Sequence, residues 1–286
     1  MQRTHAATAS TMPVFPPADN SIPTGVFSPA RPSDQRTACP ILNALSNHGI
    51  LPRDGRDITA SQLRSAMRYL SVSPELAYLA VFGPYNFHPP SALLRSAKEK
   101  GVYTDAQRNR VIDYSLLNLG PGFIEHDVSI SRQDREVGDP IRADPALLKQ
   151  FLSFRPPGSS YAITDTAVYR KKRYAQQAMS NKSMKYGLVE HSIVAGETTG
   201  LHNIFGQGWN YEIPQSWLKA LFVEERLPIE EGWRVRSFPF TVIEGWLVWI
   251  FVFIFAWPFT SMRELWQGSA KSAVRESKLS RIVHSF

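Results

Sequence analysis

Cysteine is nearly absent from this chain, because Cys39 is the only cysteine among 286 residues. A lone cysteine has no partner within the chain for a disulfide, and it cannot build a multi-cysteine zinc or iron–sulfur site. A basic face interleaved with aromatic residues is also lacking. The net charge of +7 comes from scattered residues, apart from the run 170–173 and the C-terminal tail. We therefore expect no nucleic-acid partner.

Strand-like alternation and hairpin turns are missing too, and no internal repeat is visible. The periodicity is helical, so the predicted fold class is all-α. We expect helices after Cys39 and after Thr59, where Gln62 completes a capping box, and another over residues 104–119. The basic run Arg170 to Arg173 lies in a predicted helix over 165–180, and we expect it to form a solvated face.

A continuous apolar segment is absent from residues 1–36, which are rich in Pro, Ser, Thr and Ala. This composition gives no indication of a secretory signal. We expect these residues to form a flexible N-terminal arm, either disordered or packed in an extended form on the domain.

The setting of Cys39 is unusual for a lone thiol. Pro40 suits the first position of a helix, and Gly49 suits its end, so Cys39 falls at the N-cap. Free amides and the positive end of the helix dipole should lower the pKa of a thiol placed there. Such a thiolate could act as a nucleophile or as an axial ligand of haem iron, whereas the simplest alternative is a small buried apolar residue.

A longer pattern surrounds this cysteine: Cys39-Pro40-x-Leu42-Asn43-x-Leu45-x-Asn47-His48-Gly49-x-Leu51-Pro52-Arg53-Asp54-Gly55-Arg56-x-Ile58-Thr59. It closely resembles the opening of the fungal haem-thiolate peroxidases, the family of chloroperoxidase and the unspecific peroxygenases. Ala38 departs from the family, which usually has proline before the cysteine. The resemblance implies a haem b cofactor whose iron is bound by the Cys39 thiolate.

A second stretch, Glu125-His126-Asp127 with Ser129 two residues later, could simply be a solvated helix end. It also matches a signature of the chloroperoxidase-like branch of the same family. By that resemblance, Glu125 and Ser129 would ligate Mg²⁺ or Mn²⁺ near a haem propionate, together with the backbone carbonyl of His126. The imidazole of His126 would orient a distal carboxylate, and Asp127 would hold that histidine.

A third stretch, residues 185–201, reads as a helix in which Glu197 lies along the apolar face. A buried, unpaired carboxylate there would have a raised pKa, which suits a proton shuttle. Glu190, two turns earlier, is the alternative, and a salt-bridged core glutamate is the simplest explanation. The resemblance places the acid–base glutamate of the family at this distance from Glu-His-Asp, so we favour Glu197.

The stretch 222–233 resembles the end of the family's catalytic domain, so we expect a haem-thiolate peroxidase domain over residues 37–240. Residues 245–262 then carry no charge and are rich in aromatic side chains, which matches a short membrane helix with interfacial tryptophans. We expect a transmembrane or membrane-inserted helix over 241–262, a basic tail over 263–286, and lipid as a partner. The expected location is an intracellular membrane, with the topology left open.

Together with the resemblance, these motifs predict an enzyme that uses hydrogen peroxide to oxidise or oxygenate a small organic molecule. The expected membrane tethering alone indicates that this molecule is lipophilic, for example in fungal secondary metabolism. Two alternatives remain at this point. One is a haloperoxidase that uses the same residues, and the other is a non-catalytic haem-binding membrane protein with the same fold.

Overall fold

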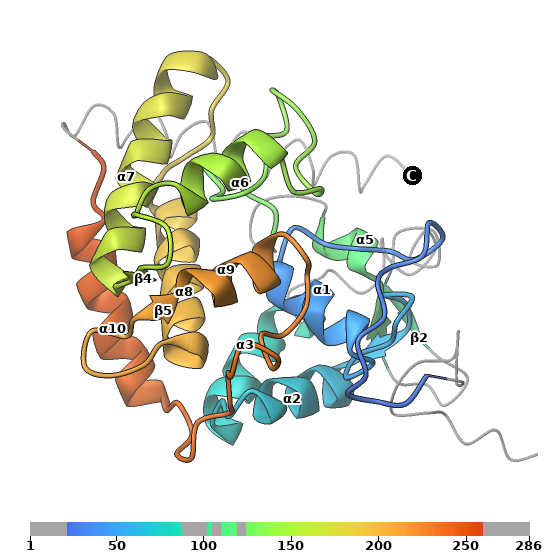
Figure 1. The fold of residues 1–286 in the computed structure, drawn as a ribbon. Helices are drawn as coiled ribbons and strands as arrows, with labels where there is room; N and C mark the ends of the chain where they lie inside the picture. The colour runs from blue at the N-terminus through green and yellow to red at the C-terminus, as the bar shows by residue number, and fades with distance from the viewer. Residues whose placement is uncertain (1–21, 87–101, 105–109, 119–123, 260–286) are drawn as a thin grey trace, which may run out of the picture.

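The computed structural model describes residues 22–86, 102–104, 110–118 and 124–259, and helices dominate them (Figure 1). The predicted all-α fold class is confirmed. The helices are α1 (Pro40–Asn47), α2 (Ala60–Tyr69), α3 (Pro74–Asn86), α5 (Tyr114–Leu117), α6 (Pro145–Leu152), α7 (Ile163–Ser180), α8 (Leu188–Phe205), α9 (Gln215–Phe222) and α10 (Val242–Phe255).

The strands of the described residues are only two or three residues long. They are β1 (Ile58–Thr59), β2 (Val102–Thr104), β3 (Arg110–Ile112), β4 (Ser160–Tyr161) and β5 (Ile213–Pro214). They pair antiparallel, in the order β1–β3–β2 and as β4–β5. The predicted helix over 104–119 is therefore wrong. The β-branched pair Val111 and Ile112 instead faces Thr59 and Ile58 of β1, and helix returns only in the short α5.

The expected start signals of the first two helices are present. Cys39 is the N-cap of α1 with Pro40 in the first position, although its side chain makes no capping hydrogen bond. Gly49 follows the helix with a φ of +66°, a left-handed conformation that glycine adopts without strain. At α2 the Thr59 hydroxyl accepts the backbone N–H of Gln62, which completes the predicted capping box.

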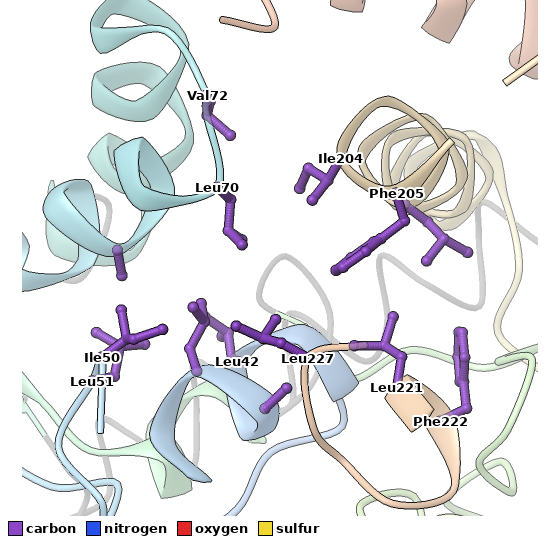
Figure 2. Packing of buried hydrophobic residues seen from close by; sticks show 14 of the residues in the cluster. Leu42, Ile50, Leu51, Leu70, Val72, Ile204, Phe205, Leu221, Phe222 and Leu227 are labelled. Carbon is purple, nitrogen blue, oxygen red and sulfur yellow. The ribbon is translucent and has the colours of Figure 1, made fainter. Parts of the chain in front are cut away.

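The main hydrophobic core lies between α1, α2, α8 and α9. Figure 2 shows Leu42, Leu70, Ile204, Phe205 and Leu221 pointing toward one another from these elements. Each fully buried side chain of this size contributes about 1.5–3 kcal/mol to folding. The core therefore fixes the distance between α1 and α8, the two helices that carry the residues of interest.

Helix α10 packs on α7 and α8 at the other side of the molecule (Figure 1). It buries Val252 and Ala256 against them, and the indole N–H of Trp249 donates to the Ser192 carbonyl oxygen at 3.0 Å. The helix has 14 residues and ends before Pro258. Over the described part of the chain, no helix combines the length and the apolar character needed to cross a membrane. The predicted membrane-spanning segment over 241–262 and the membrane location are therefore wrong.

The loop that enters α1 is held by polar side chains of that helix. Asn43 accepts the backbone N–H of Thr37 at 3.0 Å and donates to the Thr37 carbonyl oxygen at 2.9 Å. Its amide also donates to Glu225 Oε1 at 2.8 Å, and the Asn47 amide donates to the Glu225 backbone carbonyl at 2.9 Å. The start of α1 is therefore tied to residue 225, 182 positions away in sequence.

Glu225 also neutralises a buried cation. The guanidinium of Arg132, 1% exposed, donates to Glu225 Oε1 at 3.0 Å and to the Ser131 hydroxyl at 2.6 Å. One carboxylate thus joins the entrance of α1 to the segment after Asp127. A buried ion pair adds little net stability, but the loss of one partner is costly because the other charge is then left uncompensated.

Glu225→Ala should accordingly destabilise the protein by about 3 kcal/mol, because Arg132 loses its counter-charge. Glu224→Ala is the matched control, since Glu224 is exposed and pairs with Arg226 at the surface, where such a pair contributes about 1 kcal/mol or less. Urea unfolding of both variants measures the difference. Equal midpoints for the two variants would contradict the role assigned to Glu225.

Candidate active site

One cavity of about 480 Å³ lies between α1, α2 and α8, which is a volume typical of cofactor and small-molecule sites. Most of its wall is apolar, and its polar lining comes from few side chains. Cys39 contributes the thiol, Glu197 the carboxylate and Arg170 the guanidinium, while the rest of the wall includes Leu42, Leu63, Met67, Leu70, Val72, Leu79, Ile204 and Phe222. The structure therefore brings the thiol and the predicted acid–base residue to the same cavity.

The thiol of Cys39 does not have the lowered pKa that its position predicts. Burial raises the pKa to about 11, although the amides of Leu42 and Ile41 act in the opposite direction. The effect of burial on the pKa thus outweighs the effect of the helix N-terminus. The predicted lowering of the pKa is therefore wrong for a Cys39 thiol without a bound metal ion. A metal ion at the sulfur would reverse the balance, because a coordinating thiol is deprotonated.

The carboxylate of Glu197 lies between two cations from different elements. His126 Nε2 is 3.1 Å from Glu197 Oε1, and Arg170 Nη2 donates to Oε2 at 2.8 Å. The side chains of His126 and Arg170 are buried, at 2% and 5% exposed, while that of Glu197 is 34% exposed and lines the cavity. The buried side chains of His126 and Arg170 therefore hold the two carboxylate oxygen atoms, while Glu197 itself lines the cavity.

These neighbours control the ionisation of the pair. Burial alone would raise the pKa of Glu197, but His126 and Arg170 outweigh it and lower that pKa to about 2. Burial alone would lower the pKa of His126, but the Glu197 charge and hydrogen bond raise it to about 9. The expected raised pKa of Glu197 is thus wrong, because the carboxylate is paired rather than isolated. At neutral pH the site holds one anion between two cations.

Arg170 is the site residue that the sequence reasoning missed. The prediction that residues 170–173 form a solvated face is correct for Lys171 and Lys172, which are exposed, and wrong for the two arginines. Arg170 is 5% and Arg173 3% exposed, and Arg173 Nε donates to the Ser129 carbonyl oxygen at 3.1 Å. The helical spacing could have predicted this burial, because Arg170 and Arg173 continue the face that begins with Ile163, Thr166 and Ala167. The buried face of α7 includes Ile163, Thr166, Ala167, Arg170, Arg173 and Gln177.

Asp127 contacts the imidazole of His126 through its backbone. The Asp127 carbonyl oxygen is 2.7 Å from His126 Nδ1, which fits a proton donated from that ring nitrogen. The carboxylate of Asp127 instead accepts the backbone N–H of Lys185 at 2.7 Å. His126 is thus oriented at both ring nitrogens, and the Asp127 side chain fastens this segment to the loop before α8.

The two predicted ligands of a divalent cation lie in different surroundings. Ser129 lines the cavity, whereas Glu125 is 1% exposed and its Oε2 accepts Arg135 Nη2 at 2.9 Å. Over the described residues, no group of three or more His, Cys, Asp and Glu side chains is arranged to hold a metal ion. A cation at Glu125 would have to share this carboxylate with Arg135, so the Mg²⁺ or Mn²⁺ site stays a prediction.

Glu190, the alternative acid–base residue, faces away from the cavity. Its Oε2 accepts the backbone N–H of Gly187 at 2.8 Å, so the side chain caps the first turn of α8. It is 1% exposed and is not part of the cavity wall. The two glutamates of α8 therefore have separate environments, and only Glu197 is positioned to meet a bound molecule.

Comparison with known proteins places the chain among peroxidases. The family model described as "Peroxidase, family 2" matches residues 25–238. The chain is 25% identical over 244 residues to a chloroperoxidase of Leptoxyphium fumago, covering 78% of this chain and 60% of that protein. It is 28% identical over 210 residues to an aromatic peroxygenase of Cyclocybe aegerita, covering 71% and 56%. A third relative, an aromatic peroxygenase of Coprinellus radians, is 28% identical over 217 residues, covering 73% and 82%.

The chain thus spans about three fifths of the length of the first two of these relatives. The match to the family model includes Cys39, the segment around His126, and Glu197. The chain belongs to peroxidase family 2, the fungal haem-thiolate peroxidases.

Proposed function

We propose that this protein is a haem-thiolate peroxidase or peroxygenase that uses hydrogen peroxide to oxidise or oxygenate a lipophilic small molecule. The observation that carries the proposal is the position of Glu197, an ionised carboxylate in the wall of the apolar cavity that also contains the Cys39 thiol. A carboxylate in such a place costs free energy unless it is paired, and here two cations hold it facing the cavity.

The residues present fit a haem group. Cys39 is the only Cys or His side chain among the described residues that line the cavity, so the wall offers one thiolate and no imidazole as a ligand for haem iron. The remaining wall is largely apolar, as a porphyrin requires. Haem bound there would supply the redox chemistry with peroxide, and the Cys39 thiolate would hold its iron and donate electron density to it.

The chain's own part in catalysis is the movement of a proton. Glu197, ionised at neutral pH, accepts a proton from one oxygen of the peroxide and returns it to the other. His126 and Arg170 keep the carboxylate oriented, and their charges make its conjugate acid a strong one, which favours the return. A purely haem-binding role would give no reason to place a charged carboxylate in the cavity wall.

The lining of the cavity supports a lipophilic substrate. Leu63, Met67, Leu70 and Leu79 provide an apolar wall that favours an aromatic or aliphatic molecule over a strongly polar one. The predicted role in fungal secondary metabolism depended on membrane tethering, and the fold removes that support. Halide oxidation would use the same residues, and no feature of the described chain favours it.

The reaction with peroxide should depend on Glu197 and not on Glu190. In the haem-loaded protein, Glu197→Gln should lower kcat/KM for peroxide by about 10²–10⁴-fold, because the proton acceptor is lost. Glu190→Gln is the matched control, since glutamine can still accept the Gly187 N–H. Haem content and urea unfolding must accompany the rates, because Glu197→Gln leaves the Arg170 charge unpaired. Equal loss in the two variants would contradict the assignment.

The charge of Arg170 should influence the pH below which the reaction with peroxide slows down. Because its charge lowers the pKa of Glu197, Arg170→Met raises that pKa, and the acidic limb of the kcat/KM profile should move to higher pH. Arg170→Lys should restore much of the original profile. Arg173→Met is the control, because Arg173 is equally buried on α7 but contacts the Ser129 backbone. An unchanged acidic limb in Arg170→Met would exclude this role.

A further inference from the structure

A buried tyrosine–histidine pair lies behind the candidate active site. Tyr186 is 2% exposed, and its hydroxyl is 3.1 Å from His191 Nδ1. The other ring nitrogen, Nε2, is 2.8 Å from the Phe253 carbonyl oxygen, which can only accept a hydrogen bond. The proton of the neutral imidazole therefore resides on Nε2, and Nδ1 accepts the Tyr186 hydroxyl. His191 Nδ1 is therefore placed to accept the hydroxyl proton of Tyr186.

This pair adjoins the residues that surround Glu197. Tyr186 packs in one cluster with Val128, Val194 and Phe259. Val128 follows His126 by two residues, and Val194 precedes Glu197 by three on α8, so it lies on the same side of that helix. Tyr186 thus packs against residues next to His126 in sequence and one turn before Glu197 on α8. His191 and Tyr186 have no part in the peroxide chemistry described above.

Aromatic rings lead from Tyr186 toward the surface. The Tyr186 ring lies 5.2 Å from that of Tyr174 and 6.1 Å from that of Phe259, as measured between ring centroids. Phe259 in turn lies 5.1 Å from Trp257. These are separations of packed rings. Tyr174 and Trp257 are both partly exposed. The oxidisable ring of Tyr174 is thus in near contact with Tyr186, and Phe259 packs between Tyr186 and the oxidisable ring of Trp257.

We propose that Tyr186 is a redox relay, through which the protein oxidises one-electron donors, such as phenols or redox proteins, that are too large for the cavity. The proposal rests on the proposed function, because hydrogen peroxide supplies the oxidising equivalents. With haem bound and peroxide as the oxidant, Tyr186 would give up an electron toward the haem, and its hydroxyl proton would pass to His191 Nδ1. The phenoxyl radical regains an electron from Tyr174 or Trp257 and its proton from His191. The proton that the oxidised Tyr174 or Trp257 releases passes to water at the surface and returns when that residue is reduced. The external donor then reduces that surface residue.

The sequence of steps balances. Each hydrogen peroxide takes up two electrons and two protons and yields two waters, so two turns of the relay consume one peroxide. The donor loses one electron in each turn, and His191 returns to its neutral form. The base matters because a buried phenol cannot lose an electron and retain its proton without creating an uncompensated buried cation.

The test compares two reactions of the haem-loaded protein with peroxide. Naphthalene probes oxidation inside the cavity, and ferrocytochrome c, which cannot enter it, probes the surface. Tyr186→Phe should slow ferrocytochrome c oxidation by at least about tenfold, because it removes the proton transfer to a positioned base. Naphthalene oxygenation per haem should stay the same. Tyr169→Phe is the matched control, since Tyr169 is a buried tyrosine of α7 outside this cluster, and it should change neither rate.

Two further measurements keep the relay testable if Tyr186→Phe folds poorly. The double variant Tyr174→Phe/Trp257→Phe should lose ferrocytochrome c oxidation to a similar degree, because phenylalanine is not oxidised under these conditions. Freeze-quench electron paramagnetic resonance, with peroxide and no donor, should show a tyrosyl radical in the wild type and in Tyr169→Phe, and none in Tyr186→Phe.

An unchanged ferrocytochrome c rate in Tyr186→Phe, or a radical signal that survives it, would overturn the relay. So would a wild-type protein that oxygenates naphthalene but does not oxidise ferrocytochrome c. If the wild type oxidises neither probe although haem is bound, the proposed function itself has failed. The two failures are therefore distinguishable.

Discussion

The position of one sulfur atom depends on a buried charge pair distant from it in sequence. Cys39 precedes α1, and the loop that carries it is held by Asn43, which also contacts Glu225. Glu225 in turn neutralises Arg132, a fully buried cation. The entrance of α1, the segment after Asp127 and the turn after α9 therefore form one unit. The packed core between α1 and α8 then sets the thiol at a defined distance from the Glu197 carboxylate.

The second constraint is the balance of charge around the cavity. An apolar cavity disfavours an ionised carboxylate, and a buried guanidinium is equally unfavourable alone. Pairing Glu197 with Arg170 and His126 solves both problems and leaves the carboxylate facing the cavity. The cations come from α7 and from the segment before Val128, while the carboxylate comes from α8. The ionisation of the site is thus a property of three chain segments brought together by folding.

Local signals allowed much of this arrangement to be predicted from the sequence. The N-cap at Cys39, the capping box at Thr59 and the helix that carries Glu197 involve residues within a turn or two of one another. The errors arose where contacts between residues far apart in the sequence determine the structure. Residues 110–112 pair with β1 instead of forming a helix, and the apolar run of α10 forms a 14-residue helix that packs on α7 and α8 and is too short to span a membrane. Arg170 pairs with a carboxylate 27 residues away. Burial likewise overrides the expected effect of the helix N-terminus on the Cys39 thiol.

The central claim is that the Cys39 thiolate binds haem iron, and the ferrous–CO spectrum of the purified haem-loaded protein tests it most directly. Sulfur opposite CO moves the Soret band to a markedly longer wavelength than a histidine ligand does. We expect that long-wavelength band in the wild type, and its loss in Cys39→Ala. A short-wavelength band in the wild type, or a long-wavelength band that persists in Cys39→Ala, would contradict the account.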